Sequence, residues 1–445
     1  MRKKYRRIYA FTLVIVFFVI APILVLYATG YRYDFGDNRV IKTGVLSIDS
    51  DPRNAQITIN GEETSSKTPT VVKNLFPGDY SVSISKDGYF AWEKSFSVSP
   101  NRSTSTERVS LLKSDNSTLV TEERASSIIF SQNDSYIAYI VPNKNKTVNL
   151  IVKQQSTLRT IRTIEGVDPD MEFLFSNNNG YIFSFNPVTN NIERLISLTE
   201  QYDVLVSSIS SISIKKLIES SKDNYLYAIT ENGLYQIDTN KGTAEILISK
   251  TIVDAILIGQ SLYYIEERED VPILLKADFD NLADSQEILT LSHNGEFFLS
   301  NIVQDYLVLH DSSNKELSLI GIQNQYSLNL NKLNPDVTRF VWSPNHNLLL
   351  FYNDFEIWVL NLELDQQELL IRSSGQIRYA DWSPDGKWII YSHEGFIKAI
   401  ELDERGKRNI IDLAQTDNIP FSINNDKKVM FYHDSSQNLF QKVIQ

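Results

Sequence analysis

A short pattern of residues recurs through most of the chain at intervals of roughly 40 residues, and it constrains the fold more than any other feature. Its clearest copies read "VWSPNHNLLLFYN" and "DWSPDGKWIIYS", in which a serine opens a polar turn and a solid apolar run follows. Eight copies are recognisable, those in the centre only faintly. Their serines are Ser131, Ser176, Ser221, Ser261, Ser300, Ser343, Ser383 and Ser422. A repeat of this length is typical of the four-stranded blades of a β-propeller.

The residue types of the repeat favour strands over stacked helices. Each copy is rich in β-branched and aromatic residues and is separated from the next by Asn, Asp, Gly and Pro. The runs "KWIIYS" and "NLLLFY" are apolar on both faces, which suits a sheet packed between two others. The segment from Ser383 to Gly386 predicts a tight turn whose serine satisfies a backbone group. We therefore interpret the serine motif as structural.

The ends of the repeat array predict how it closes. The last copy, from about Pro420, contains three apparent strands where a blade needs four. The segment Ser117 to Glu122 precedes the first copy and has a strand-like composition. We expect it to join the final blade and close a ring of eight blades, which removes the free sheet edges. A seven-bladed ring is the alternative if one faint central copy is not a blade.

The N-terminus predicts a membrane anchor. Five basic residues in "MRKKYRR" precede an uncharged apolar stretch from Ile8 to Ala28, which as a helix is about 31 Å long and matches the hydrocarbon core of a bilayer. The basic residues place the N-terminus in the cytoplasm and the rest of the chain outside. A cleaved signal peptide is the competing interpretation, but the stretch exceeds a typical signal core and no A-x-A site follows.

A short spacer, residues 31–43, leads into a compact β unit. Asn60-Gly61 between two alternating runs predicts a tight hairpin, and Asp87-Gly88 predicts the turn of a second one. Tyr80, Val82 and Ile84 alternate with polar residues, so we expect one buried face and one wet face.

These residues resemble a PEGA domain, a small β-sandwich module of bacterial envelope proteins, over about Gly44 to Lys113. The features that carry the resemblance are Ser50-Asp51-Pro52, Ile59-Asn60-Gly61, Thr68-Pro69, the segment from Leu75 to Tyr80, and Lys86-Asp87-Gly88-Tyr89. The four-letter string that names the family is replaced by Pro77-Gly78-Asp79. The resemblance implies a surface or wall-associated module without catalysis.

The "WSPDGKWIIYS" elements resemble those of TolB-type envelope propellers over about residues 118–445, most clearly in the first and the last three copies. Members of that superfamily include peptidase-associated propellers, translocation partners and binding scaffolds. The resemblance therefore implies recognition rather than one reaction.

Motifs of catalysis and cofactor binding do not occur. The sequence has no G-x-S-x-G elbow, H-E-x-x-H helix, P-loop or dinucleotide fingerprint, and it has no cysteine. Three of its five histidines, His310, His393 and His433, follow apolar runs, where we expect structural roles. The net charge of −12 argues against a nucleic-acid binder. We expect no enzyme, no metal site and no cofactor.

Taken together, the sequence predicts an all-β protein with an N-terminal transmembrane helix. The expected parts are residues 1–30 as cytoplasmic tail and anchor, 31–43 as spacer, 44–113 as a PEGA-like sandwich and 117–445 as a propeller. The expected function is a membrane-anchored extracytoplasmic scaffold that binds an envelope protein or a cell-wall glycan. An envelope hydrolase or a peptidase-associated propeller is the alternative.

Loops that break the repeat spacing are the expected contact surface. The inserts "VPNKNKTVN" from Val141 and "EEREDVP" from Glu266 are charged, and we expect them to be exposed. The candidate partner-binding residues are Glu266, Glu267, Arg268, Glu269 and Asp270.

Overall fold

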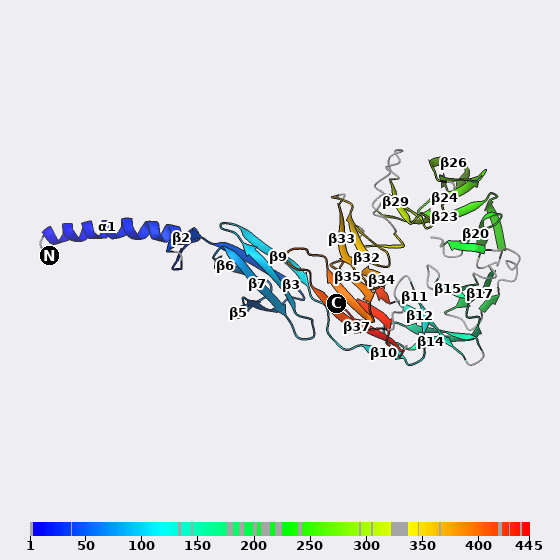
Figure 1. The fold of residues 1–445 in the computed structure, drawn as a ribbon, viewed down its shortest axis with the longest axis horizontal. Helices are drawn as coiled ribbons and strands as arrows, with labels where there is room; N and C mark the ends of the chain where they lie inside the picture. The colour runs from blue at the N-terminus through cyan, green and yellow to red at the C-terminus, as the bar shows by residue number, and fades with distance from the viewer. Residues whose placement is uncertain are drawn as a thin grey trace. The chain divides into compact units, whose positions relative to one another are not determined.

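The structure, a computed structural model, consists of strands preceded by a helix (Figure 1). It describes residues 3–36, 38–131, 135–143, 146–175, 181–186, 191–198, 203–205, 214–218, 225–238, 243–292, 295–303, 306–321, 337–345, 347–364, 366–416, 421–426, 428–436 and 438–445. The chain divides into two compact units. The first unit contains residues 1–116, 399–413 and 444–445, and the second contains residues 117–398 and 414–443.

The first unit begins with α1 (Lys3–Ala28), whose residues Tyr9–Ala28 are apolar and long enough to cross a membrane. A two-stranded hairpin of β1 (Tyr31–Asp34) and β2 (Arg39–Lys42) follows it. The predicted helix is thus present, and the predicted spacer is an ordered hairpin.

A sandwich of two sheets follows the hairpin. One sheet has the order β6-β3-β9 and the other β5-β4-β7-β8. The strands are β3 (Gly44–Asp51), β4 (Gln56–Ile59), β5 (Glu62–Lys67), β6 (Thr70–Leu75), β7 (Gly78–Ser85), β8 (Trp92–Val98) and β9 (Ser103–Ser110). Alternate residues of β3, β7 and β8 are buried, as the polar alternation predicted.

Both predicted turns of the sandwich are present. Asn60 and Gly61 have positive φ angles of 50° and 83° between β4 and β5, so the tight hairpin is confirmed. Gly88 also has a positive φ and lies in a longer connection between β7 and β8.

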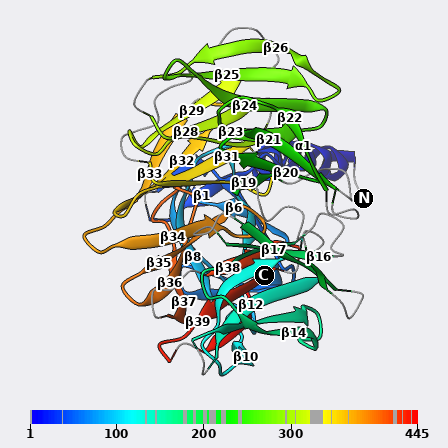
Figure 2. The same cartoon turned by 90° about the vertical axis from the view of Figure 1, so that its right-hand side faces the viewer.

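The described residues of the second unit form antiparallel sheets in chain order (Figure 2). The first four sheets contain β11 (Ser126–Phe130), β12 (Tyr136–Pro142), β13 (Val148–Gln154) and β14 (Thr160–Val167); β15 (Glu172–Phe175), β16 (Tyr181–Asn186), β17 (Asn191–Ser197) and β18 (Asp203–Leu205); β19 (Ile214–Ile218), β20 (Tyr225–Thr230), β21 (Gly233–Asp238) and β22 (Thr243–Ile248); and β23 (Ile252–Ile258), β24 (Ser261–Arg268), β25 (Val271–Asp278) and β26 (Asn281–Thr290).

The remaining sheets run to the end of the chain. They contain β27 (Phe297–Val303), β28 (Tyr306–Asp311) and β29 (Glu316–Gly321); β30 (Arg339–Trp342), β31 (Leu348–Tyr352), β32 (Glu356–Asn361) and β33 (Gln366–Arg372); β34 (Ile377–Trp382), β35 (Trp388–His393), β36 (Phe396–Glu401) and β37 (Ile410–Gln415); and β38 (Ser422–Asn424), β39 (Val429–His433) and β40 (Leu439–Val443), joined by β10 (Thr118–Thr121). The number of blades, eight with seven as the alternative, stays a prediction.

Successive sheets pack face to face. Leu275 and Tyr264 of one sheet share a cluster with Tyr227 and Ile229 of the preceding sheet, and Ile265 shares another with residues of the following sheet. The second strands, such as β24 and β35, are buried along nearly their whole length. Runs that are apolar on both faces therefore lie between neighbouring sheets, as the sequence predicted.

The repeated serine has the same role in three copies, those of Ser131, Ser343 and Ser383. The side chains of Ser131, Ser343 and Ser383 are buried. Each hydroxyl accepts a hydrogen bond, at 2.9 to 3.0 Å, from the backbone N–H five residues later. In these three copies the serine bonds the first residue of the second strand of its sheet, so the structural interpretation is confirmed for them. Ser261, Ser300 and Ser422 instead lie within β24, β27 and β38. Ser176 and Ser221 lie outside the described residues.

The predicted closing strand is also present. β10 pairs antiparallel with β40, with Thr118 opposite Gln441 and Leu119 opposite Phe440. The Tyr432 hydroxyl lies 2.8 Å from Ser117 Oγ. Val120 packs in one cluster with residues of β12 and β39, so the last sheet packs against the first.

Candidate functional site

The predicted contact residues lie at the end of β24 and in the tight turn that follows it, not on an irregular insert. β24 and β25 pair without interruption up to Arg268 and Val271, and the turn between them consists of Glu269 and Asp270, both with positive φ. The insert from Val141 is likewise the end of a hairpin, since β12 and β13 pair from Tyr136 to Gln154. Its residues 144–145 lie outside the described residues.

Glu266 was predicted to be exposed, and this was wrong. Glu266 is only 3% exposed, because β24 packs against the sheets before and after it. The carboxylate lies 3.0 Å from Lys250 Nζ and 2.5 Å from Arg268 Nε. Burial alone raises the pKa of Glu266, but the hydrogen bonds from Arg268 and Lys250 outweigh burial and lower it below the ordinary value. Glu266 and Arg268 therefore hold the sheet together, and Glu267, Glu269 and Asp270 form the exposed acidic part of the turn.

A second buried ion cluster lies in the first unit, and the sequence analysis missed it. Along β8, Trp92, Lys94, Phe96 and Val98 occupy the buried positions, so a lysine lies in the inward phase of an amphipathic strand. A charged side chain in that phase needs a partner of opposite charge. This local signal was readable in the sequence, although it does not name the partner.

The partners of Lys94 come from residues 399–413. Its Nζ lies 3.1 Å from Glu401 Oε2 and 3.2 Å from Asp403 Oδ2. The Lys94 side chain is fully buried and that of Glu401 is 9% exposed. Glu401 also accepts hydrogen bonds from Trp92 Nε1 at 2.7 Å and from Asn409 Nδ2 at 2.9 Å. The cluster is thus a network in which each buried charge has several partners.

Arg405 extends the network to the other sheet of the sandwich. It contacts Asp403 at 2.8 Å and donates to the backbone carbonyls of Ser105 and Thr106. Burial alone raises the pKa of Asp403, but the guanidinium of Arg405, helped by Lys94, lowers it to about 2. Asp403 is therefore ionised throughout the physiological range.

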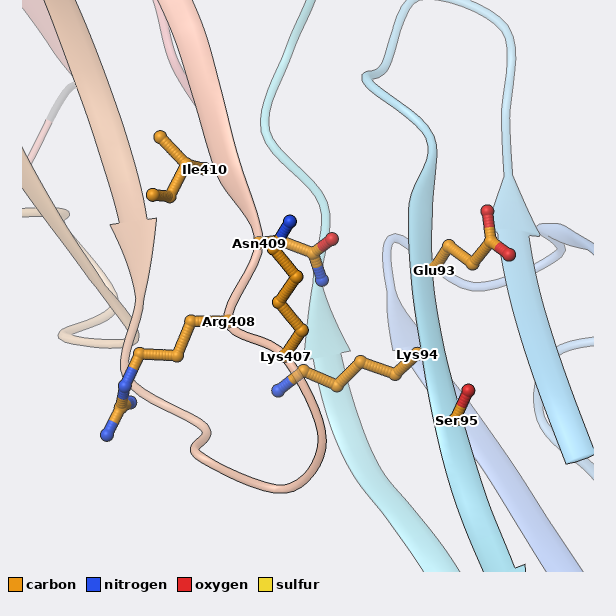
Figure 3. Close-up of a pocket in the computed structure, with 7 residues that line it drawn as sticks. All are labelled: Glu93, Lys94, Ser95, Lys407, Arg408, Asn409 and Ile410. Carbon is orange, nitrogen blue, oxygen red and sulfur yellow. The ribbon is translucent and has the colours of Figure 1, made fainter. Parts of the chain in front are cut away.

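A pocket of about 440 Å³ adjoins the cluster (Figure 3). It is lined by Glu93, Lys94, Ser95, Lys407, Arg408, Asn409 and Ile410. Lys94 points from β8 toward the segment that carries Lys407, whereas Glu93 points the opposite way. The charge of Lys94 is matched by two carboxylates. The exposed cation of the pocket lining is Lys407, at its edge. The lining side chains are mostly charged or polar, so they offer hydrogen-bonding groups.

The remaining candidates have structural positions. Trp92 is 1% exposed and packs against Phe96. His310, His393 and His433 lie at strand ends, as predicted, and His393 Nε2 lies 2.6 Å from Ser373 Oγ. His293 and His346 lie outside the described residues. Within those residues, no group of three or more acidic or histidine side chains is placed to hold a metal ion.

Comparison with protein families identifies the sandwich. Residues 43–110 match the PEGA domain family. No curated protein matches the sequence.

Solved structures similar to this chain are β-propellers. The C-terminal WD40 domain of Sif2 is 13% identical, with a TM-score of 0.50, over 75% of this chain and 98% of that one. A eukaryotic initiation factor is 11% identical (TM-score 0.50; 71% and 82% covered), and the dihydro-heme d1 dehydrogenase NirN in complex with DHE is 8% identical (0.50; 68% and 69%). At these identities the likeness establishes the fold alone. The chain therefore combines a PEGA domain with a C-terminal β-propeller, while the TolB-type likeness stays a prediction.

Proposed function

We propose that this protein is a membrane-anchored scaffold that binds a protein or a glycan of the cell envelope outside the cytoplasm. The observation that supports it best is the combination, in one chain, of an apolar N-terminal helix, a PEGA domain and a propeller. The propeller suits recognition because its packed sheets fix the turns at their ends, while the sequences of the turns are free to vary.

The helix supports the anchor. Residues Tyr9–Ala28 contain no charged residue and are apolar enough to cross a membrane, and basic residues precede them. The positive-inside bias then places the N-terminus in the cytoplasm and both folded units outside. External protease added to intact cells should degrade the sandwich and propeller. Resistance until the membrane is lysed would contradict this orientation.

The exposed part of the β24–β25 turn is the contact surface that we propose. The full-length protein in detergent is incubated with envelope extract to capture protein partners. In a separate assay it is incubated with purified wall glycans. The variant Glu269→Gln with Asp270→Asn should reduce the captured material about tenfold, because it removes two exposed charges without disturbing the strands.

The matched control is Asp280→Asn with Asp284→Asn, which removes two exposed charges near the opposite end of β25, where it turns into β26. Equal loss in both variants would indicate a general charge effect and contradict the proposed surface.

An envelope hydrolase or peptidase-associated propeller is the alternative. Saturable cleavage of wall fragments or peptides by the purified protein would favour it over the scaffold.

A further inference from the structure

The end of α1 is bonded tightly to the hairpin that follows it. Gly30 has a φ of +90°, and its carbonyl accepts hydrogen bonds from both the N–H and the hydroxyl of Thr43 at 2.9 and 2.8 Å. Arg32 donates to the Tyr27 carbonyl at 2.7 Å and to Asn74 Oδ1 at 2.8 Å. A cation at a helix C-terminus satisfies carbonyls that lack a partner within the helix. These bonds fix the hairpin relative to the last turn of α1 and to β6.

The hairpin has an aromatic and apolar face. In its register Tyr31 is opposite Lys42, and Tyr33 is opposite Val40, so these four side chains lie on one face. Phe35 follows at the tip and packs edge-on against Tyr33, with ring centroids 5.0 Å apart. Phe35 is 85% exposed and Val40 is 56% exposed. Large apolar side chains exposed together on a short hairpin indicate a surface that is covered by something else.

This face adjoins the apolar span of α1. Phe35 and Val40 line a cavity of about 580 Å³ together with Ile23 and Leu26 of α1 and Phe76, which follows β6. Ile23 and Leu26 lie inside the apolar span Tyr9–Ala28. The tip of the hairpin is therefore level with the last turns of the span (Figure 1). If α1 crosses a bilayer, the cavity opens to lipid at the boundary between acyl chains and headgroups.

We propose that the β1–β2 hairpin and Phe76 form a membrane-docking surface whose occupant is phospholipid of the outer face of the bilayer. Phe35 and Val40 insert among the upper acyl chains, tyrosines Tyr31 and Tyr33 lie at the headgroup level, and Lys42 faces the negative phosphates. The PEGA sandwich is then held against the bilayer and not on a free tether. This inference rests on the proposed membrane anchor and extends it from one helix to a folded platform.

Site-directed spin labelling tests the inference on the full chain, because the sequence has no cysteine and one substitution gives one label. Phe35→Cys and Val40→Cys are labelled with a nitroxide in phosphatidylcholine nanodiscs. Leu364→Cys is the matched control, since Leu364 is 63% exposed on the turn after β32. Collisions with apolar oxygen and with a water-soluble nickel chelate are then compared.

Positions 35 and 40 should collide more with oxygen than with the nickel chelate, and position 364 should show the reverse. If both hairpin positions behave like position 364, the inference is overturned. Co-flotation with vesicles separates the two proposals. If the protein floats with the vesicles while both hairpin labels remain in water, the membrane anchor is supported and only the docking surface is contradicted. If the protein does not float, both proposals are contradicted.

Discussion

The two units both join residues that are more than 300 positions apart, but they do so by different chemistry. In the first unit, the side chain of Lys94 meets Glu401 and Asp403 through buried charge, and Trp92 and Glu401 are 309 residues apart. In the second, β10 meets β40 through backbone pairing, supported by one hydrogen bond between Ser117 and Tyr432. We call these the charge closure and the strand closure.

The difference lies in how the free energy is distributed. A strand pair spreads its hydrogen bonds over backbone groups that every residue carries, so a single side-chain change leaves those bonds in place. A buried ion cluster concentrates it in a few atoms, and removing one of them leaves another charge without a partner. The charge closure should therefore be sensitive to point mutation and to acid, and the strand closure should be sensitive to deletion.

Deletion of residues 118–121 should have the largest effect. It removes the whole edge strand and the buried Val120 from the packing between the first and last sheets, so we expect the melting temperature to fall by roughly 10 °C or more. Differential scanning calorimetry measures this. The control is Leu119→Ser, an exposed position that should leave the transition within a degree or two. An unchanged transition after the deletion would contradict the strand closure.

Lys94→Ala should come next. It leaves the carboxylate of Glu401 buried without its cation, and we expect a loss of about 3–5 kcal/mol in the free energy of unfolding of the first unit. Glu93→Ala, on the exposed face of the same strand, is the control and should change it by less than about 0.5 kcal/mol. The double variant Lys94→Met with Glu401→Gln should recover much of the loss in urea titrations. Equal effects at positions 93 and 94 would show that charge burial is not the cause.

Acid should weaken the charge closure selectively. Because the pKa of Asp403 is lowered from 3.8 to about 2, the folded state binds fewer protons than the unfolded state between these values. The stabilisation is complete above pH 4 and is lost as the pH falls toward 2. Unfolding followed from pH 5 to 2 should show this slope for the first unit, and Asp403→Asn should remove it. A slope that persists in that variant must come from other carboxylates.

The strand closure should respond at a higher pH and more weakly. Burial lowers the pKa of His433, at the end of β39, below 6.5. The neutral ring is favoured in the folded state, so stability is full above pH 6.5 and declines as the pH falls below that value. His433→Gln should flatten the dependence of the melting temperature between pH 8 and 5.5. Parallel curves for the variant and the wild type would exclude His433 as the titrating group.

Tyr432→Phe should have the smallest effect. It removes the single hydrogen bond to Ser117 while the ring continues to stack on Phe440, so we expect a loss of about 0.5–1.5 kcal/mol in the free energy of unfolding. Chemical denaturation of the wild type and the variant measures the difference. A loss as large as that of Lys94→Ala would show that the strand closure is as concentrated as the charge closure.

The features predicted correctly from the sequence are those set by neighbours in the chain or by a count. The serine motif was readable because the hydroxyl of Ser383 bonds a backbone group only five residues away. The Asn60-Gly61 turn depends on two residues with positive φ. The closing strand β10 could be predicted because the last repeat shows three strands where a blade has four. Counting strands requires no knowledge of tertiary contacts.

The features that were missed depend on tertiary partners. Glu266 looked exposed because it is charged, yet its strand is buried on both faces and Lys250 and Arg268 neutralise it. The inward phase of Lys94 was readable between Trp92 and Phe96, but nothing local identifies Glu401 as its partner. The predicted outer bounds of the four parts stay predictions.

The pairing of β10 with β40 also has a consequence for the order of events during synthesis. Ser117 leaves the ribosome 315 residues before Tyr432, which at about 5–20 residues per second is roughly 16 to 63 s. Throughout that interval the nascent closing strand has no partner, and any other free edge is a competitor for it. Its brevity, four residues with threonine at both ends, makes it a poor template for wrong partners. The pairing of β10 with β40 can therefore form only after β40 has been synthesised.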